Sequence, residues 1–180
     1  MRHILLAALI LISAQSIAAE PKSNEALMEL KKQDQAARST STGTIDWKKV
    51  SGEDAERRSK VAEMLRAGEV KTAVDFFNAA LIYQHGGTVG DIRMAYSLAN
   101  VSAMLDPHNV SAKWLTAAAW DRIMLRLNKP QWYGTQFTKT DPAGKFELYK
   151  IDESAVTDED RVAMGVPTLA ESKIKATKLK

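Results

Sequence analysis

Side chains suited to acid–base or binding chemistry are concentrated in the string Gln131-Trp132-Tyr133-Gly134-Thr135-Gln136, which begins ten residues after Asp121. The string brings amides, a phenol and a hydroxyl close together, and its glycine allows a ligand or another backbone to come near. Such polar groups must be paired if they are buried. They either bond the backbone where a hairpin meets helices, which we favour, or line a pocket with His85 and Asp121-Arg122.

His85 follows the most apolar of the predicted helices, at 72–84, and precedes Gly86-Gly87. A histidine at a helix C-terminus is commonly a capping or dipole partner. To act as a general base it would need an orienting acid, and Asp121 is the attractive candidate in the sequence. His85 and Asp121 are therefore the catalytic candidates. The candidate binding residues in this region are Arg122, Gln131, Tyr133, Thr135 and Gln136.

Nothing in the sequence supplies an evident nucleophile or a set of metal ligands. There is no cysteine, and His3 would be lost with a cleaved leader, so a zinc site would need an unusual carboxylate-rich set. The acids at Glu153 and 158–160 lack the spacing of a calcium-binding EF-hand loop. We therefore expect no metal, no cofactor and, on balance, no enzymatic activity.

The N-terminus has the order of a secretory signal peptide. A basic start at Arg2 precedes the apolar run Ile4–Ile12, and small residues around Ser16-Ile17-Ala18 suit cleavage before Ala19 or Glu20. The run is shorter than the roughly 20 residues that span a bilayer. We expect residues 1–19 to be removed, no transmembrane segment afterwards, and a periplasmic or secreted protein.

Acidic and basic residues are almost balanced along the chain. The formal net charge is +3, and the sequence has no stripe of Arg and Lys of the kind that binds nucleic acid. The one local excess is a Lys-rich tail at 173–180. Partners are expected to be a protein, a peptide or a small molecule.

Helical periodicity dominates the chain after the leader. Residues 20–50 predict a polar helix with a thin face of Leu27 and Leu30, followed by a linker at 39–44. The linker lets this helix move or fray, unless Ile45 and Trp47 pin the segment after it. Residues 51–172 predict the main helical domain, starting with a capping box at Ser51. Its helices cover about 51–68, 72–84, 88–106 and 109–127, and their apolar residues predict one core formed by Phe76, Phe77, Leu81, Leu98, Leu115 and Ile123.

The period changes after Pro130. Residues 132–140 and 146–151 predict two strands around the turn Asp141-Pro142-Ala143-Gly144, giving a β-hairpin at about 132–151. We expect residues 133–136 to pack against the helix that carries Asp121-Arg122, close to the end of the helix that stops at His85. Further capping boxes predict the start of the helix at 88–106 (Thr88 with Asp91), of a short helix (Thr157) and of a last one (Thr168).

Two resemblances accompany these patterns. Leu105-Asp106-Pro107-His108-Asn109 resembles the turn of tetratricopeptide or Sel1-type helical hairpins, although a single unit is not a solenoid. Residues 83–169 resemble an uncharacterised bacterial domain marked by a Gln-x-Tyr-Gly-Thr-Gln motif after a helix carrying Asp-Arg. That resemblance implies roles for His85 and for the segment from Asp158 to Arg161 and Gly165, and it adds Arg161 to the binding candidates. It implies no known activity.

The sequence thus predicts a mainly α fold, an antiparallel helical bundle or helical-hairpin array with one C-terminal β-hairpin. Its preferred function is an exported soluble binding or interaction domain. The alternative is a hydrolase-like enzyme that uses His85 and Asp121 with the Gln131–Gln136 segment.

Overall fold

The computed structural model describes residues 20–39, 44–141 and 144–179. The predicted signal peptide and the centre of the predicted turn, Pro142-Ala143, lie outside these residues. Within them the chain forms seven helices and a two-stranded antiparallel sheet, which confirms the mainly α fold with a C-terminal hairpin. The elements are α1 Glu25–Ala36, α2 Trp47–Arg66, α3 Ala73–Gln84, α4 Val89–Leu105, α5 Val110–Arg126, β1 Phe137–Thr138, β2 Glu147–Leu148, α6 Asp158–Ala163 and α7 Leu169–Lys178.

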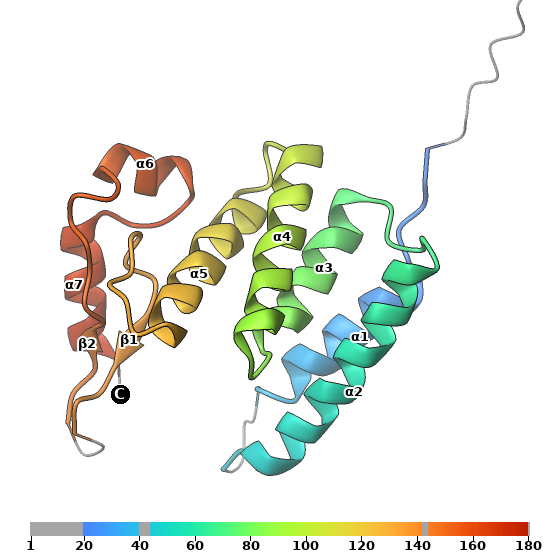
Figure 1. The fold of residues 1–180 in the computed structure, drawn as a ribbon, viewed down its shortest axis with the longest axis horizontal. Helices are drawn as coiled ribbons and strands as arrows, with labels where there is room; N and C mark the ends of the chain where they lie inside the picture. The colour runs from blue at the N-terminus through green and yellow to red at the C-terminus, as the bar shows by residue number, and fades with distance from the viewer. Residues whose placement is uncertain (1–19, 40–43, 142–143, 180) are drawn as a thin grey trace, which may run out of the picture.

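Helices α3, α4 and α5 stand side by side in the middle of the molecule (Figure 1). Helices α1 and α2 cover one side of this layer, and the hairpin with α6 and α7 lies beyond α5 on the other. Leu98, Leu115 and Ile123 are buried in the core, while Phe76, Phe77 and Leu81 pack against it half-buried, so the predicted core group is confirmed.

Reciprocal caps define where four of the helices begin. In each, a threonine hydroxyl accepts from the backbone of an acid three residues on, whose carboxylate accepts from the threonine backbone. Three of the pairs were predicted, and Thr72 with Asp75 adds a fourth. The predicted capping box at Ser51 is wrong. Helix α2 starts at Trp47 because the Asp46 carboxylate accepts from the backbone N–H groups of Lys48 and Lys49, two and three residues further on.

Helix α1 belongs to the core instead of standing apart from it. Leu27 is fully buried and Leu30 nearly so, both in the same cluster as the α3 and α4 side chains. The backbone N–H of Asn24 also donates to Oδ1 of Asp75 at 2.7 Å, which ties the start of α1 to the start of α3. Most of the predicted linker, residues 40–43, lies outside the described residues, and α1 on its N-terminal side is packed into the core.

The hairpin is much shorter than predicted. Its register pairs Phe137 with Leu148 and Thr138 with Glu147, and a single parallel bridge joins Gln131 to Ile151. Residues 132–135 curl into a turn because their backbone N–H groups point at a buried carboxylate on α5, described below, and so cannot join a strand ladder.

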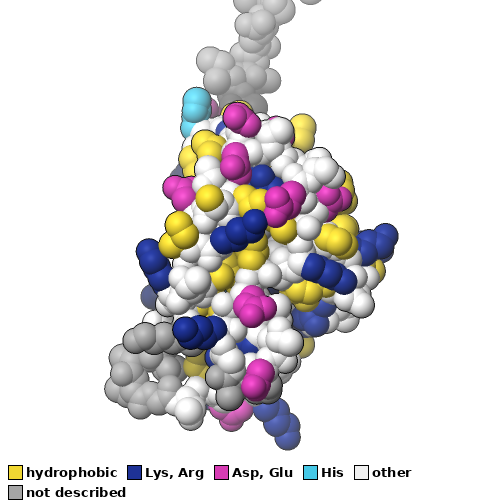
Figure 2. Space-filling model, turned by 90° about the vertical axis from the view of Figure 1, so that its left-hand side faces the viewer, with side chains coloured by type: hydrophobic (Ala, Val, Ile, Leu, Met, Phe, Trp, Pro, Cys, Tyr) yellow, Lys and Arg dark blue, Asp and Glu magenta, His cyan; other side chains and the backbone are white. Residues whose placement is uncertain are grey.

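The face formed by the hairpin, α6 and α7 carries acidic and basic side chains intermixed with apolar ones, with no single-sign field across it (Figure 2). None of the helices in the described part of the chain combines the length and the hydropathy needed to cross a bilayer.

Candidate functional site

Asp121 is the centre of a buried hydrogen-bond network. Its side chain is fully buried on α5. One carboxylate oxygen accepts from the backbone N–H groups of Trp132 and Tyr133 at 2.8 and 3.0 Å. The other accepts from the backbone and hydroxyl of Thr135 at 2.9 and 2.8 Å. All of these bonds close the turn, so Asp121 has a structural role here and does not orient His85.

Two more candidate binding residues belong to this hydrogen-bond network. The Gln131 amide, fully buried, donates to the carbonyl oxygens of Gln136 and Tyr149 at 3.0 and 2.9 Å and accepts from the backbone of Gln136 at 2.8 Å. Arg161, nearly fully buried, donates to the carbonyls of Trp132 and Tyr133 at 3.0 and 3.3 Å. These bonds fit the structural interpretation of the string.

Arg122 stands out from this arrangement. Its guanidinium, half-buried, donates from Nη1 to the carbonyl oxygen of Gln84 at 2.6 Å and from Nε to Oε1 of Gln136 at 3.3 Å. Both acceptors are neutral, and no carboxylate of the described residues lies within 4.0 Å. Burial, together with the charges of Arg126 and Arg38, lowers the pKa of Arg122. It still carries its charge at neutral pH.

These contacts confirm the prediction that residues 133–136 pack against the helix carrying Asp121-Arg122, close to the end of α3. Asp121 and Arg122 serve different partners, as adjacent helix residues must. Through Gln84 and Gln136, Arg122 links the end of α3 to the turn.

His85 has an orienting acid, and it is Asp34. Nδ1 of His85 lies 2.9 Å from Oδ1 of Asp34, a fully buried carboxylate on α1. A carboxylate only accepts, so Nδ1 carries a proton and Nε2 is the ring nitrogen left for another partner. The side chain of His85 is 21% exposed, which leaves this edge of the site open to solvent.

Two arginines and a second carboxylate surround Asp34. Arg38 donates to Oδ1 of Asp34 at 3.1 Å and also bonds Asp54, and Arg57 donates to Asp54 at 2.6 Å. Burial alone would raise the pKa of Asp54, but the hydrogen bonds and charges of the two arginines outweigh it and lower that pKa. We call Arg38, Arg57, His85 and Arg122, with the two aspartates, the cation cluster.

Two buried atoms in or beside this cluster have no hydrogen-bond partner among the described residues: Nε of Arg57, which lies 4.0 Å from Asp34, and Oε1 of Gln84. Buried polar groups of native proteins are nearly always paired. The cluster therefore has donor and acceptor capacity that the described protein groups do not satisfy.

The sequence contained a signal for the missed residues. Leu27, Leu30 and Asp34 fall on one stripe of α1, and Val50, Asp54, Arg57 and Val61 fall on one stripe of α2; all are buried. Charged residues that continue an apolar stripe are placed in the core, where only a specific role retains them.

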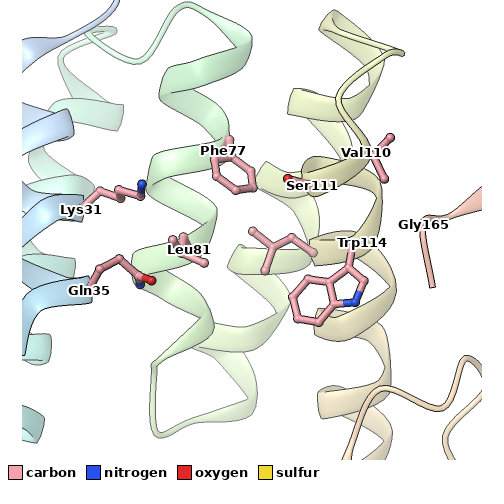
Figure 3. A pocket seen from close by; sticks show the side chains of 9 residues that line it. Lys31, Gln35, Phe77, Leu81, Val110, Ser111, Trp114 and Gly165 are labelled. Atoms are coloured by element: carbon pink, nitrogen blue, oxygen red, sulfur yellow. The ribbon is translucent and has the colours of Figure 1, made fainter. Parts of the chain in front are cut away.

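An apolar pocket of about 550 Å³ lies between α1, α3 and α5 (Figure 3), and none of the residues of the cation cluster lines it. Phe77 and Leu81 of α3 and Trp114 and Leu115 of α5 form its apolar walls, and Lys31 and Gln35 of α1 border it. From Leu81 to His85 is four helical residues, a rise of about 6 Å, and from Leu115 to Arg122 about 10 Å. The apolar pocket and the cation cluster are therefore neighbouring parts of one face.

The residues of the cation cluster are not a suitable set of ligands for a metal ion. Among the described residues, no group of three or more histidines and carboxylates is arranged to hold one. Its guanidinium groups and imidazole suit an anion, through bidentate and charge-assisted hydrogen bonds.

Comparisons of the chain with protein-family models, with curated proteins and with solved structures give no match.

Proposed function

We propose that the protein is an exported binding domain for a small organic anion. The observation that supports the proposal is Arg122, a half-buried cation that bonds only neutral acceptors. A charge withdrawn from water without a partner is costly, and a carboxylate or phosphate on a ligand would supply that partner. The remaining arginines of the cluster are already matched with carboxylates, so Arg122 is the residue left for a ligand to neutralise.

The pocket next to the cluster supports an organic ion over an inorganic one. An anionic head at Arg122 would place the rest of the ligand along α3 and α5, toward Phe77, Leu81 and Leu115. Ligand sites typically combine apolar walls with a few convergent polar groups in this way.

The binding proposal is tested by the thermal midpoint of the purified chain against a panel of anions: octanoate, benzoate, succinate and inorganic phosphate. A ligand that binds the native state raises the midpoint, because at a concentration of 100 Kd it adds about 2.7 kcal/mol to the free energy of unfolding. We expect at least one organic anion to do so in the wild type and not in Arg122→Gln.

Arg126→Gln is the matched control, because Arg126 lies one turn further along α5 and is exposed. It should keep the ligand response. A panel without any response, or an Arg122→Gln variant that responds like the wild type, would rule the proposal out.

A hydrolase-like enzyme is the second candidate, and the His85–Asp34 contact at 2.9 Å favours it. In this version Asp34 takes the orienting role that the sequence suggested for Asp121, and Nε2 of His85 is the general base for a water molecule. Ester and amide hydrolysis that is abolished in His85→Gln and retained in His108→Gln would support it. Activity unchanged in His85→Gln would reject it.

Export rests on the N-terminal sequence pattern. Mass spectrometry of protein from the cell envelope or medium of its source should find a chain that begins at Ala19 or Glu20, and an intact Met1 would contradict this. We also infer a relationship to the bacterial domain with the Gln-x-Tyr-Gly-Thr-Gln motif, supported by the way this string packs on the Asp-Arg helix.

A further inference from the structure

A second pocket, of about 280 Å³, lies where α4 and α5 meet the turn at Trp132-Tyr133. Four aromatic side chains border it, two from the helices and two from the turn: Tyr96, Trp120, Trp132 and Tyr133. Each is half-buried, so each covers part of the pocket wall without filling the cavity. The anion proposal uses none of these residues.

Three of the rings form a continuous wall. The ring centroids of Tyr96 and Trp120 are 5.6 Å apart at an interplanar angle of 50°, and those of Trp120 and Trp132 are 4.6 Å apart at 55°. Successive rings are tilted and all three border one cavity, so the wall is stepped around the cavity and is not flat. Such a wall can present aromatic surface to a ligand from more than one direction.

The polar groups around this pocket are neutral. Asn100 supplies an amide, Tyr96, Thr116 and Tyr133 supply hydroxyls, and the indole N–H of Trp120 is buried without a hydrogen-bond partner among the described residues. None of the described residues that border the pocket carries a formal charge. No cation lines it, so a positively charged ligand would meet no direct repulsion there.

Negative charge lies behind the aromatic wall. The fully buried Asp121 carboxylate accepts from the backbone of Trp132 and Tyr133, and no cation of the described residues lies within 4.0 Å of it. Arg161, on the carbonyl side of the same two residues, is itself paired with Asp158 at 3.1 Å. Burial raises the pKa of Tyr133, and Tyr96 and the carboxylates of Asp121 and Asp160 raise it further.

We propose that this aromatic pocket binds a quaternary ammonium group. The face of an aromatic ring is the negative end of its quadrupole and attracts a cation, most strongly for tryptophan. A quaternary ammonium has no N–H to satisfy, so it needs no hydrogen-bond acceptor from the pocket, whereas a primary ammonium would have to replace its hydrogen bonds to water. A neutral sugar ring could also contact the rings, but it would gain nothing from the carboxylate behind them.

The test uses choline chloride and tetramethylammonium chloride as probes, titrated into the purified chain by calorimetry, with sodium chloride at equal ionic strength. The neutral carbon analogue of choline, 3,3-dimethylbutan-1-ol, has the same shape without the charge. We expect saturable binding of both cations and affinity for the analogue lower by about tenfold or more. Equal affinity for choline and the analogue, saturable binding of methyl glucoside instead, or no saturable binding of either cation would overturn the proposal.

Two variants connect the binding to the wall. Trp132→Leu should weaken choline binding by about tenfold or more. Trp47→Leu is the matched control, because Trp47 is 62% exposed on α2, away from this pocket. If Trp132→Leu does not fold, Tyr96→Ser removes the opposite end of the wall and should show the same loss. Choline affinity unchanged in a folded wall variant would refute the site.

Discussion

Removal of the Asp121 carboxylate should be one of the most destabilising changes available in this chain. The side chain is fully buried and accepts four hydrogen bonds, three of them from backbone N–H groups of the turn. In Asp121→Ala these three donors lose their partner, and each buried donor left unpaired costs about 1–3 kcal/mol. The donors are only partly buried and the turn can open to water, so the low end applies and the expected loss is about 3–4 kcal/mol.

The conservative variant refines the argument. In Asp121→Asn one amide oxygen still accepts from two of the donors, but the amide nitrogen meets the N–H of Thr135. We expect about half the loss of the alanine variant. Thr135→Val removes the 2.8 Å hydroxyl bond to the same carboxylate, so its effect and that of Asp121→Ala should be coupled by ~0.5 kcal/mol or more.

Urea unfolding at neutral pH measures all of these differences. Glu56→Gln, which removes an exposed carboxylate on α2, is the control and should stay within about 0.5 kcal/mol of the wild type. A loss of less than ~1 kcal/mol in Asp121→Ala would show that the turn does not depend on this carboxylate.

Three further results are expected. Burial by itself would raise the pKa of Asp75, but hydrogen bonds from backbone N–H groups and a hydroxyl outweigh it and lower that pKa. The stability that results is present above the unfolded pKa of about 3.9 and is lost as the pH falls through the folded pKa. The free energy of unfolding, measured by urea melts at a series of acidic pH values, should therefore fall less steeply with pH in Asp75→Asn. Leu115→Ala, at a side chain only 1% exposed, should cost about 2–5 kcal/mol, whereas Leu105→Ala, 55% exposed, should be nearly neutral in the same melts. Gly86→Ala should lower the thermal midpoint, because its Cβ would lie 2.1 Å from that of Asp91, and an unchanged midpoint would show that the turn before α4 can shift freely.

The helices could be predicted because their signals are local. Threonine followed by an acid three residues on marks a helix start within four residues of sequence, and apolar spacing marks the buried face. The start of α2 was missed because two capping signals, Asp46 and Ser51, compete within five residues of sequence, and the aspartate satisfies two backbone donors. The predicted strands were too long because the residue pattern of 132–136 is the same whether its backbone N–H groups donate to a neighbouring strand or to a carboxylate.

The partner of His85 could not be chosen from the sequence. Asp34 is 51 residues away, on a helix whose polar composition set it apart from the main domain. Asp121 was nearer to the polar string and looked available, but the turn uses both of its oxygens. Pairings of this kind depend on which helices become neighbours, and helical periodicity carries no information on that.

The attachment of α1 to α3 has a kinetic consequence. Helices α3, α4 and α5 follow one another along the chain and contact in that order, whereas α1 contacts α3 across a long loop of sequence that includes α2. Contacts between near neighbours form early in folding, and those that close long loops form later. The last step of folding would therefore bring Asp34 against His85, and a partial opening that releases α1 would dismantle the cation cluster while the central helices stay intact. Amide protons of α1 should exchange faster than those of α4, and an anion held by the assembled cluster should slow the exchange of α1 most.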